Sequence, residues 1–505
     1  MKPRNPLNDE GYTLTEEEIK KLERKISKVY KEAADELKKT IREYFAYFEK
    51  RDEEMKALIG TEVNGRLWTE QDYKMWRMNQ IARGERYKAL QEKVAKRMTD
   101  ANATAISYIN DATPGIYSLN RNYAAYLIES VAPDVDFTLW DEQTVRRLIV
   151  KDPSLMPYYP LERALKRGID LAWGKKQITA SITSAILQGK SVKKMADDLQ
   201  RRIPEMNRAS AIRTARTAAT GAQNAGRMDS YDAAQKMGIK MKKKWLASLD
   251  NRTRHAHAML DGQMVEVDKP FEVDGYKIMF PGDTSAPGYL VYNCRCRIVA
   301  AFDDMPKGKR RAEDPVTGKS EIIPEMSYQE WEAKKRAENA EVWDTYMKKG
   351  RNRSADTRQW NEYKSVLGNK IPNTIDKFQN LKYTEPEKWE RLKSEKRMTD
   401  FVENAPCATT LRKYTEFFLK PGAKHADQFF DVGYMEEEPV RLRYDMAKQF
   451  DKSKAVNISI DENGKERFRI YMYLGVDKKK RFRTVWINDG ADGRPRIVTA
   501  FREED

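Results

Sequence analysis

Residues 244–299 begin KWLASLDNRTRHAHAMLDGQMV and end FPGDTSAPGYLVYNCRCRIV. The window holds two of the three histidines and two of the three cysteines in a chain of 505 residues. These four residues are His255, His257, Cys294 and Cys296. Because the scarcest side chains of the protein gather in one short window, we predict that they build a site or a structural brace there.

Several motifs follow one another in this window. Trp245 is followed by the patterns D-x-R-T-R-x-x-H, L-D-G, P-x-D and N-C-R-C. This series resembles the phage Mu F-like head morphogenesis family, whose members are minor head proteins. Upstream, Arg216-Thr217 and Asn224-Ala225-Gly226 resemble the R-T and N-x-G elements of that family. Ala218 departs from the pattern, because many members carry an acidic residue after R-T, so no role tied to that acid transfers.

The resemblance implies a structural role in a virus particle. It predicts a protein that is made in the host cytoplasm, binds the portal protein and other head proteins during prohead assembly, and stays in the virion. Packaged DNA would be a further partner. The net charge of +16, from 94 Lys and Arg against 78 Asp and Glu, also favours polyanionic partners. Alternatively, the many charged residues only keep the protein soluble and bind no particular partner.

The histidines and cysteines of the window allow two kinds of site. Imidazole and thiolate are ligands that zinc prefers, so His257, Cys294 and Cys296 predict a structural zinc site if the loop meets the last strand. Asp250, Asp283 or His255 would then be the fourth ligand. The C-x-C spacing departs from the usual two to four intervening residues. The alternative is a hydrogen-bonded ion-pair network that clips the loop, formed by Asp250, Arg252, Arg254, His257 and Asp261.

A catalytic use of the same residues is disfavoured. His257 acting as a base for a Cys294 nucleophile would need a nucleophile elbow or a similar motif, and none is present. Three cysteines in so long a chain do not make a disulfide framework, which favours a reducing compartment. No apolar run approaches the roughly 20 residues that span a bilayer, so we expect no membrane association.

The N-terminal part predicts long helices. Apolar residues recur over 13–58 with an average step of about 3.6, the helical period. Thr15 and Glu18 suggest a capping box. A second helical pattern covers 69–109, and the sequences DATPG and VAPD predict a break over 111–134. The two apolar stripes would cover each other, or one helix would dock on another subunit.

Shorter helices are predicted downstream. They cover 140–150 and 161–187, then a helix, turn and helix over 178–203 with Gly189 as a C-terminal cap, then an alanine-rich helix over 207–238. The run 303–320 is rich in Gly, Pro and charge and predicts a linker or an exposed loop. Helical segments over 327–398 follow and are assigned to a connector.

The last part of the chain predicts a separate α+β domain. Helices lead to four strands over 455–461, 466–475, 481–489 and 495–502, and the turns over 462–464, 476–478 and 490–493 suit an antiparallel meander. The block resembles nucleases of the barnase, EndoU, colicin and RelE type. The matching residues are Lys424-His425, Gly433-Tyr434, Trp486, Pro495-Arg496 and Thr499.

This resemblance implies an RNA substrate and a metal-independent ribonuclease. Its tentative catalytic residues are His425, Lys424, Arg496 and Thr499. His425 would move protons, the two cations would stabilise charge on the phosphorane, and Thr499 would bind the phosphate. Arg467, Arg469, Arg481 and Arg483 would follow the RNA backbone. The alternative is a docking module in which His425 is an ordinary surface residue.

Together these patterns predict a multidomain protein. It has a long α-helical N-terminal region over 1–155 and a small α+β Mu F-like domain over 156–302. A linker and helical connector cover 303–395, and a nuclease-like α+β domain with an antiparallel sheet covers 396–505. No cofactor is predicted apart from the possible structural zinc.

Overall fold

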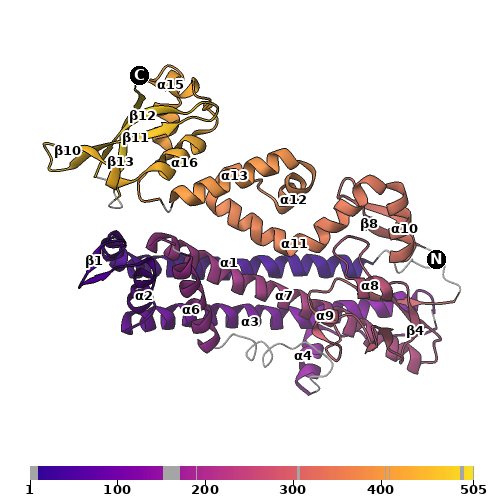
Figure 1. Ribbon diagram of the computed structural model, residues 1–505. Helices are drawn as coiled ribbons and strands as arrows, with labels where there is room; N and C mark the ends of the chain where they lie inside the picture. The colour runs from indigo at the N-terminus through magenta and orange to yellow at the C-terminus, as the bar shows by residue number, and fades with distance from the viewer. Residues whose placement is uncertain are drawn as a thin grey trace. The chain divides into compact units, whose positions relative to one another are not determined.

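The computed structural model describes residues 9–132, 134–151, 171–188, 190–303, 308–403, 405–408, 410–488 and 494–503. The chain forms two compact units, shown in Figure 1. The first comprises Met1–Phe48, Lys74–Gln188 and Val192–Arg351, and the second comprises Glu49–Tyr73, Gly189–Ser191 and Asn352–Asp505. No helix in the described ranges combines the length and the apolar character needed to cross a membrane.

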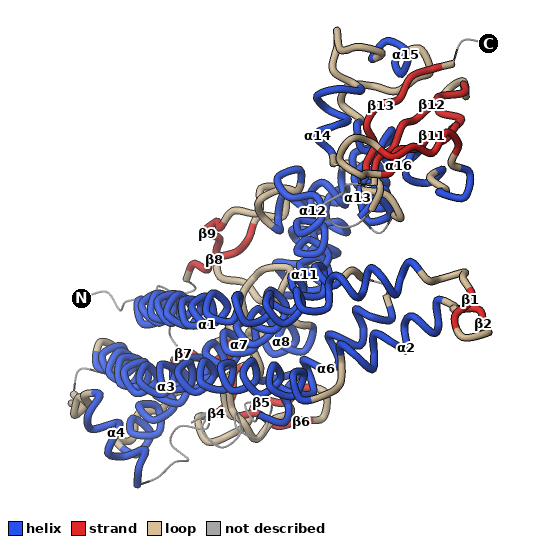
Figure 2. The backbone as a smooth tube through the Cα atoms, turned by 90° about the vertical axis from the view of Figure 1, so that its left-hand side faces the viewer, coloured by secondary structure: helices blue, strands red, loops and turns tan. Residues whose placement is uncertain are grey.

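Long helices make up most of the first unit, which confirms the prediction of a helical N-terminal region. They are α1 (Glu10–Ala57), α2 (Glu70–Ile81), α3 (Glu85–Glu129), α4 (Glu142–Lys151), α6 (Leu171–Leu187) and α7 (Val192–Lys236). In Figures 1 and 2, α1, α3 and α7 run side by side. The apolar stripe of α1, which includes Ile26, Ala33 and Ile41, is buried in a core shared with α3, α6 and α7. The helices therefore cover each other's stripes.

The start of α1 differs from the prediction. The helix begins at Glu10, so Thr15 lies inside it and its hydroxyl donates to the Gly11 carbonyl at 2.7 Å. Asp9 is the residue that caps the helix, because its carboxylate accepts from the Tyr12 amide at 2.8 Å. The predicted capping box at Thr15 and Glu18 is wrong. Asp and Thr are both common capping residues, so the sequence allows either Asp9 or Thr15 to cap the helix.

Two prolines lie inside helices where the sequence predicts breaks. The break expected over 111–134 is wrong, because α3 continues through Pro114 to Glu129. Pro114 cannot donate to the Asn110 carbonyl, and the Thr113 hydroxyl donates to that carbonyl instead, at 3.4 Å. An interior proline costs about 3 kcal/mol in an isolated helix, and here packing along α7 outweighs that cost.

The helix α7 likewise runs through Pro204, joining two helices that the sequence predicts to be separate. The expected helix over 161–187 is described only from Leu171. Gly189, the predicted cap, lies outside the described residues, as do the start of that helix and the turn over 490–493.

A small sheet follows the helices in the first unit. Its strand order is β4-β3-β7, and both neighbours are antiparallel to β3. The strands are β3 (Lys242–Leu246), β4 (Met264–Glu266) and β7 (Arg297–Ala301), with a hairpin of β5 (Phe271–Val273) and β6 (Tyr276–Ile278) and short helices α8 (His255–Leu260) and α9 (Gly288–Val291) between them. Trp245 is fully buried at the centre of this core.

Part of the run predicted as a linker or exposed loop, residues 309–313, is instead the first strand of a second hairpin. Its strands are β8 (Lys309–Glu313) and β9 (Ser320–Pro324). Helix α10 (Tyr328–Glu338) and the start of α11 (Ala340–Leu367) follow it. Trp331 and Trp343 pack in one cluster with Leu249, at the loop of the 244–299 window. The charged residues of this hairpin include Arg310, which is buried and paired with Asp261.

The second unit contains the C-terminal α+β fold, and its antiparallel sheet is confirmed. Four strands form a meander in the order β10-β11-β12-β13. They are β10 (Val456–Ile460), β11 (Glu466–Leu474), β12 (Lys480–Ile487) and β13 (Arg496–Arg502). The preceding helical elements are α12 (Ile375–Thr384), α13 (Pro386–Glu403), α14 (Leu411–Lys413), the π-helical turn η3 (Tyr414–Phe418), α15 (Ala426–Phe430) and α16 (Pro439–Gln449). One face of the sheet, with Phe468, Phe482 and Trp486, packs in the core with α16 (Figure 1).

Candidate functional site

The histidine and the two cysteines of the 244–299 window meet in the interior of the first unit. His257 lies on α8, and Cys294 and Cys296 lie just before β7. Nδ1 of His257 is 3.2 Å from Sγ of Cys296 and 3.4 Å from Sγ of Cys294. Their ligand atoms all lie within 4.8 Å of one another. The three side chains are between 2% and 3% exposed, so no substrate can reach Cys294 as a nucleophile.

The other ring nitrogen fixes the orientation of His257. Nε2 lies 3.0 Å from the Leu290 carbonyl, which can only accept a hydrogen bond. Nε2 therefore carries a proton, and Nδ1 faces the sulfurs. The Cys296 amide donates to Sγ of Cys294 at 3.3 Å. Burial raises the pKa of the Cys294 thiol, but hydrogen bonding from Cys296 and the nearby His257 outweigh it and hold that pKa well below its usual range.

The residues considered as a fourth ligand are occupied elsewhere or exposed. Asp250 forms a bidentate ion pair with Arg295, with Nη2 to Oδ1 at 2.8 Å. Asp283 accepts from the Met279 and Ser285 amides, each at 2.9 Å, and so holds a turn. His255 is exposed on the outer side of α8.

The loop is held at several points, but the closest ion-pair partners of Asp250 and Asp261 are Arg295 and Arg310, which lie outside the predicted network. Asp250 also accepts from the Arg252 amide at 2.9 Å. Arg254 donates to the Tyr289 and Tyr292 carbonyls. Burial raises the pKa of Asp250, but its hydrogen bond and ion pair with Arg295 outweigh burial and lower that pKa. The loop and the Cys-Arg-Cys segment are therefore closed against each other with or without an ion.

Asp261 forms a buried ion pair with Arg310. Its carboxylate receives both guanidinium NH₂ groups of Arg310, at 2.8 and 3.0 Å, and the Ala247 and Tyr328 amides, each at 2.6 Å. The Asp261 side chain is 0% exposed and that of Arg310 is 5% exposed. The β8–β9 hairpin thus supplies Arg310, which neutralises the buried carboxylate of Asp261 in the first unit.

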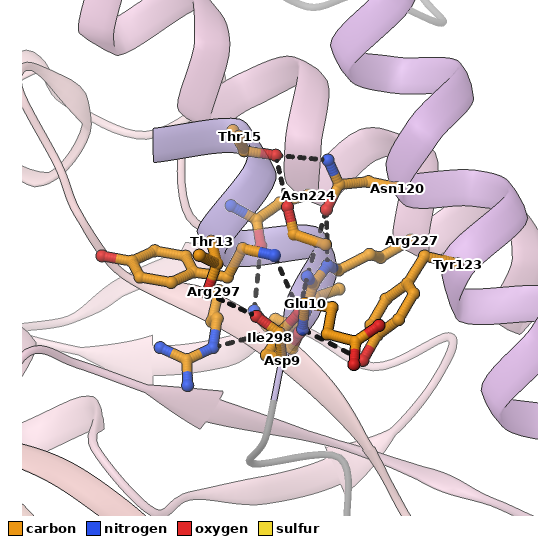
Figure 3. A network of polar contacts seen from close by, with 12 residues as sticks. Asp9, Glu10, Thr13, Thr15, Asn120, Tyr123, Asn224, Arg227, Arg297 and Ile298 are labelled. Atoms are coloured by element: carbon orange, nitrogen blue, oxygen red, sulfur yellow. Dashed lines mark hydrogen bonds and ion pairs between the residues drawn. The ribbon is translucent and has the colours of Figure 1, made fainter. Parts of the chain in front are cut away.

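A second buried network ties the start of α1 to the sheet, and sequence reasoning missed it (Figure 3). Arg227 of α7 pairs with Asp9 through both nitrogens, at 2.6 and 2.7 Å, and donates to the Ile298 carbonyl of β7 at 3.0 Å. Arg297 is 3.0 Å from the same carboxylate. Asn120 of α3 accepts from Arg227 at 3.0 Å. Residues of α7 and β7 therefore contact the Asp9 carboxylate, and α3 joins the network through Arg227.

The R-T and N-x-G elements of α7 face the end of the sheet. Thr217 accepts from the Asn293 amide at 2.9 Å. The side-chain amide of Asn224 accepts from the Ile298 amide at 2.9 Å and donates to the Cys296 carbonyl at 3.3 Å, as a neighbouring strand would. A Cβ atom at Gly226 would lie 2.4 Å from the Tyr117 carbonyl oxygen, so this glycine allows α3 and α7 to touch. Ala218 is buried in the helical core.

In the C-terminal sheet, alternate residues form a second face rich in arginine and aromatic side chains. Because strand residues alternate, the positions between the core residues Phe468, Phe482 and Ala500 point away from that core. We call this set the arginine–aromatic face: Arg467, Arg469, Tyr471, Tyr473, Arg481, Arg483, Thr499 and Phe501. Arg481 lies over the Tyr471 ring at 4.3 Å, and Arg483 lies over the Phe501 ring at 4.4 Å.

His425 joins this face at the N-terminus of α15. Its ring stacks on Phe501 with centroids 5.4 Å apart and planes at 29°. His425 adopts a left-handed conformation, φ 73°, which is uncommon outside glycine and aims the residue out of the helix. Burial and the neighbouring Lys424 lower the pKa of His425.

Two of the other predicted catalytic residues, Thr499 and Arg496, lie on β13. Thr499 lies two residues from Phe501, while Arg496 pairs with Ile487 at the start of the strand. Lys424 is exposed beside His425. Arg483 and His425 both contact the ring of Phe501, which was not among the predicted site residues. The alternation in RFRTV and TAFR places Arg483 and Phe501 on the outward-facing positions of their strands.

Comparisons with known proteins give a consistent group of relatives. The family described as phage Mu protein F like protein matches residues 176–299. Minor head protein GP7 of Bacillus phage SPP1 is 30% identical over 241 residues, which cover 46% of this chain and 74% of that protein. The NAD(+)--arginine ADP-ribosyltransferase EFV of Enterococcus faecalis is 33% identical over 167 residues, 32% of each chain. The uncharacterized protein YqbB of Bacillus subtilis is 29% identical over 184 residues, 36% of this chain and 55% of its own length. No solved structure matches the chain.

Proposed function

Because this chain belongs to the family of Mu F-like phage minor head proteins, we propose that it acts in prohead assembly at or near the portal. The chain is made in the host cytoplasm, joins other head proteins and remains in the virion beside the packaged DNA. The observation that carries this proposal is the match over 74% of the length of a phage minor head protein. The net charge of +16 suits contacts with DNA or with acidic protein surfaces.

The assembly role is tested by locating the chain in particles. Proheads and virions from an infected culture are purified, and the chain is detected by mass spectrometry. We expect it in both, and we expect recombinant full-length chain to bind purified portal protein with an affinity that falls as salt rises. Absence from both kinds of particle would overturn the assignment to the virion. Binding to a major capsid protein alone would overturn the portal contact.

We further propose that the C-terminal domain cleaves RNA at the arginine–aromatic face. The grouping of His425, Phe501 and Arg483 supports this proposal. Aromatic rings next to arginines suit unpaired bases and their phosphates, because bases stack on rings while guanidinium groups bind the backbone. The lowered pKa of His425 keeps more of its imidazole neutral near pH 7, as a proton acceptor requires.

In this mechanism His425 accepts the proton of the ribose 2′-hydroxyl as that oxygen attacks the adjacent phosphorus. The bond from phosphorus to the 5′-oxygen then breaks, the 5′-oxygen takes up a proton from water, and His425 releases the proton it accepted to solvent. Arg483 stabilises the extra negative charge on the phosphorane, and Thr499 donates a hydrogen bond to a phosphate oxygen. Lys424, next to His425, and Arg496, at the start of β13, contribute to RNA binding.

The ribonuclease proposal is tested with the full chain and a fluorescent single-stranded RNA in the presence of a metal chelator. His425→Ala is expected to lower cleavage by about 10²- to 10⁴-fold, the usual contribution of a general base. His255→Ala is the matched control, since His255 is exposed but lies in the other unit. Lack of cleavage by the unaltered chain would favour the alternative, a structural head protein whose C-terminal domain is inactive. Equal cleavage by His425→Ala would exclude His425 as the base.

A further inference from the structure

We propose that His257, Cys294 and Cys296 bind one zinc ion inside the first unit. The ion would join α8 to the segment before β7 and would have a structural role, separate from portal binding and from RNA cleavage. Three groups of the kinds that zinc prefers, two sulfurs and one imidazole nitrogen, meet in a site that is closed to solvent.

The distances between the ligand atoms suit a tetrahedral ion. Zinc bonds of about 2.3 Å to sulfur and about 2.0 Å to nitrogen place the nitrogen and a sulfur about 3.5 Å apart across one edge of the tetrahedron. The two distances from Nδ1 of His257 to the sulfurs are 3.2 and 3.4 Å. These separations need only small movements to admit the ion.

The surroundings of the three ligands resemble the outer shell of a metal site. A metal-binding histidine usually donates its other N–H to a carbonyl or a carboxylate, which fixes the tautomer. Here Nε2 of His257 faces the Leu290 carbonyl at 3.0 Å. The Cys296 amide donates to Sγ of Cys294 at 3.3 Å, which favours a thiolate. The α7 residues Thr220 and Asn224 hold the carbonyls of Cys294 and Cys296, at 2.8 and 3.3 Å.

Without an ion, the same group is poorly satisfied. Two sulfurs lie within 3.4 Å of the single ring nitrogen Nδ1 of His257. That nitrogen can take part in one hydrogen bond, so at most one of the two sulfurs is its partner. Zinc would satisfy all three atoms at once. The nearby acids Asp250 and Asp261 are held by Arg295 and Arg310, so the proposal rests on the three ligands His257, Cys294 and Cys296.

The test is zinc content and its dependence on single residues. The full chain is expressed with added zinc, dialysed without chelator and analysed by inductively coupled plasma mass spectrometry. We expect about one zinc ion per chain, and less than about a tenth of that after Cys294→Ser or Cys296→Ser. Cys407→Ser and His255→Asn are matched controls that should keep their zinc, because Cys407 is a buried cysteine elsewhere and His255 is an exposed neighbour.

A second measurement covers the case in which the serine variants do not fold. The unaltered chain is stripped with a chelator, and its melting temperature is followed as zinc or cobalt is added. The proposal expects a higher melting temperature with either ion and a visible cobalt–thiolate absorption. Zinc near zero in the unaltered chain with no thermal shift on addition would overturn it. Zinc that stays bound in both serine variants would place the ion elsewhere and overturn it too.

Discussion

At the residue scale, Asp261 shows how a motif of the family works as a structural support. The L-D-G sequence places a carboxylate in the interior, where it receives Arg310 and two backbone amides. We predict that Asp261→Asn lowers the free energy of unfolding of the first unit by about 3–5 kcal/mol, because it leaves a buried arginine without its counter-charge. Denaturant unfolding, followed by tryptophan fluorescence, measures this loss. Asp268→Asn, at an exposed ion pair with Lys269, should change the value by less than about 1 kcal/mol. An equal loss in both variants would contradict the prediction.

Lys243 provides a pH test at the same scale. This lysine is 0% exposed and donates to the Met279 carbonyl at 3.0 Å, and burial lowers its pKa to about 8. The unfolded chain holds that proton up to about pH 10.4, so the unfolded state binds more protons between about pH 8 and pH 10. Stability therefore carries the full cost of the buried charge below pH 8 and regains it as the pH rises through that window.

Replacing the lysine removes this dependence. We predict that Lys243→Met raises the melting temperature at pH 7 and that its advantage over the unaltered chain shrinks between pH 8 and pH 10. Differential scanning calorimetry at several pH values provides the measurement. Lys242→Met is the control, because Lys242 is the exposed neighbour on the same strand. Parallel pH profiles for Lys243→Met and the unaltered chain would show that the buried amine carries no such cost.

At the scale of elements, the contact between α3 and α7 depends on one glycine. A Cβ atom at Gly226 would lie 2.4 Å from a backbone oxygen of Tyr117, so the helices must separate to admit it. We predict that Gly226→Ala destabilises the first unit by about 1–3 kcal/mol despite the higher helix propensity of alanine. Gly115→Ala in α3 meets only the Glu142 side chain, at 3.3 Å, and should be neutral or gain up to about 1 kcal/mol. Melting temperatures of the two variants decide the matter, and a stabilised Gly226→Ala would refute the close contact.

How far the elements could be predicted depended on whether their determinants are local. Periodicity found α1 and alternation found β11 to β13, because each pattern repeats within a few residues. Pro114 misled the prediction of α3, since the compensating contacts come from a helix about a hundred positions away. Strand β8 lies in a run predicted as a linker because the run is rich in charged residues. The sequence does not show that one of them, Arg310, is buried and paired with Asp261.

The candidate sites follow the same division. Rarity of His and Cys pointed to the cluster around His257, and the D-x-R-T-R loop lies where its motif suggests. The Asp9–Arg227 pair was not predicted, because its partners are separated by 218 positions and neither belongs to a local pattern. Alternation predicts which face Arg483 and Phe501 occupy on their own strands, but the contact of Phe501 with Arg483 and His425 depends on the strand register and on the position of α15.

At the scale of the whole molecule, the first unit, which we call the head region, extends beyond the residues 176–299 that match the family. The boundary expected at residues 302 and 303 stays a prediction, but the compact unit continues through the β8–β9 hairpin and α10 to Arg351. Tyr346 of α11 accepts from the Asn251 amide at 3.0 Å, and Trp331 and Trp343 are buried against the same loop. Removing residues 303–351 would expose the Asp250 loop to solvent and leave Asp261 without Arg310.

We therefore predict different behaviour for two N-terminal fragments. The fragment 1–351 should be soluble and melt in one cooperative transition close to that of the first unit in the full chain. The fragment 1–302 keeps every family motif but loses Arg310 and the two tryptophans, and burying an unpaired carboxylate costs several kcal/mol. It should melt at a lower temperature or aggregate. Calorimetry of both fragments, with the full chain beside them, tests this expectation. Equal melting temperatures would mean that the hairpin and α10 rest on a head region that is already complete at residue 302.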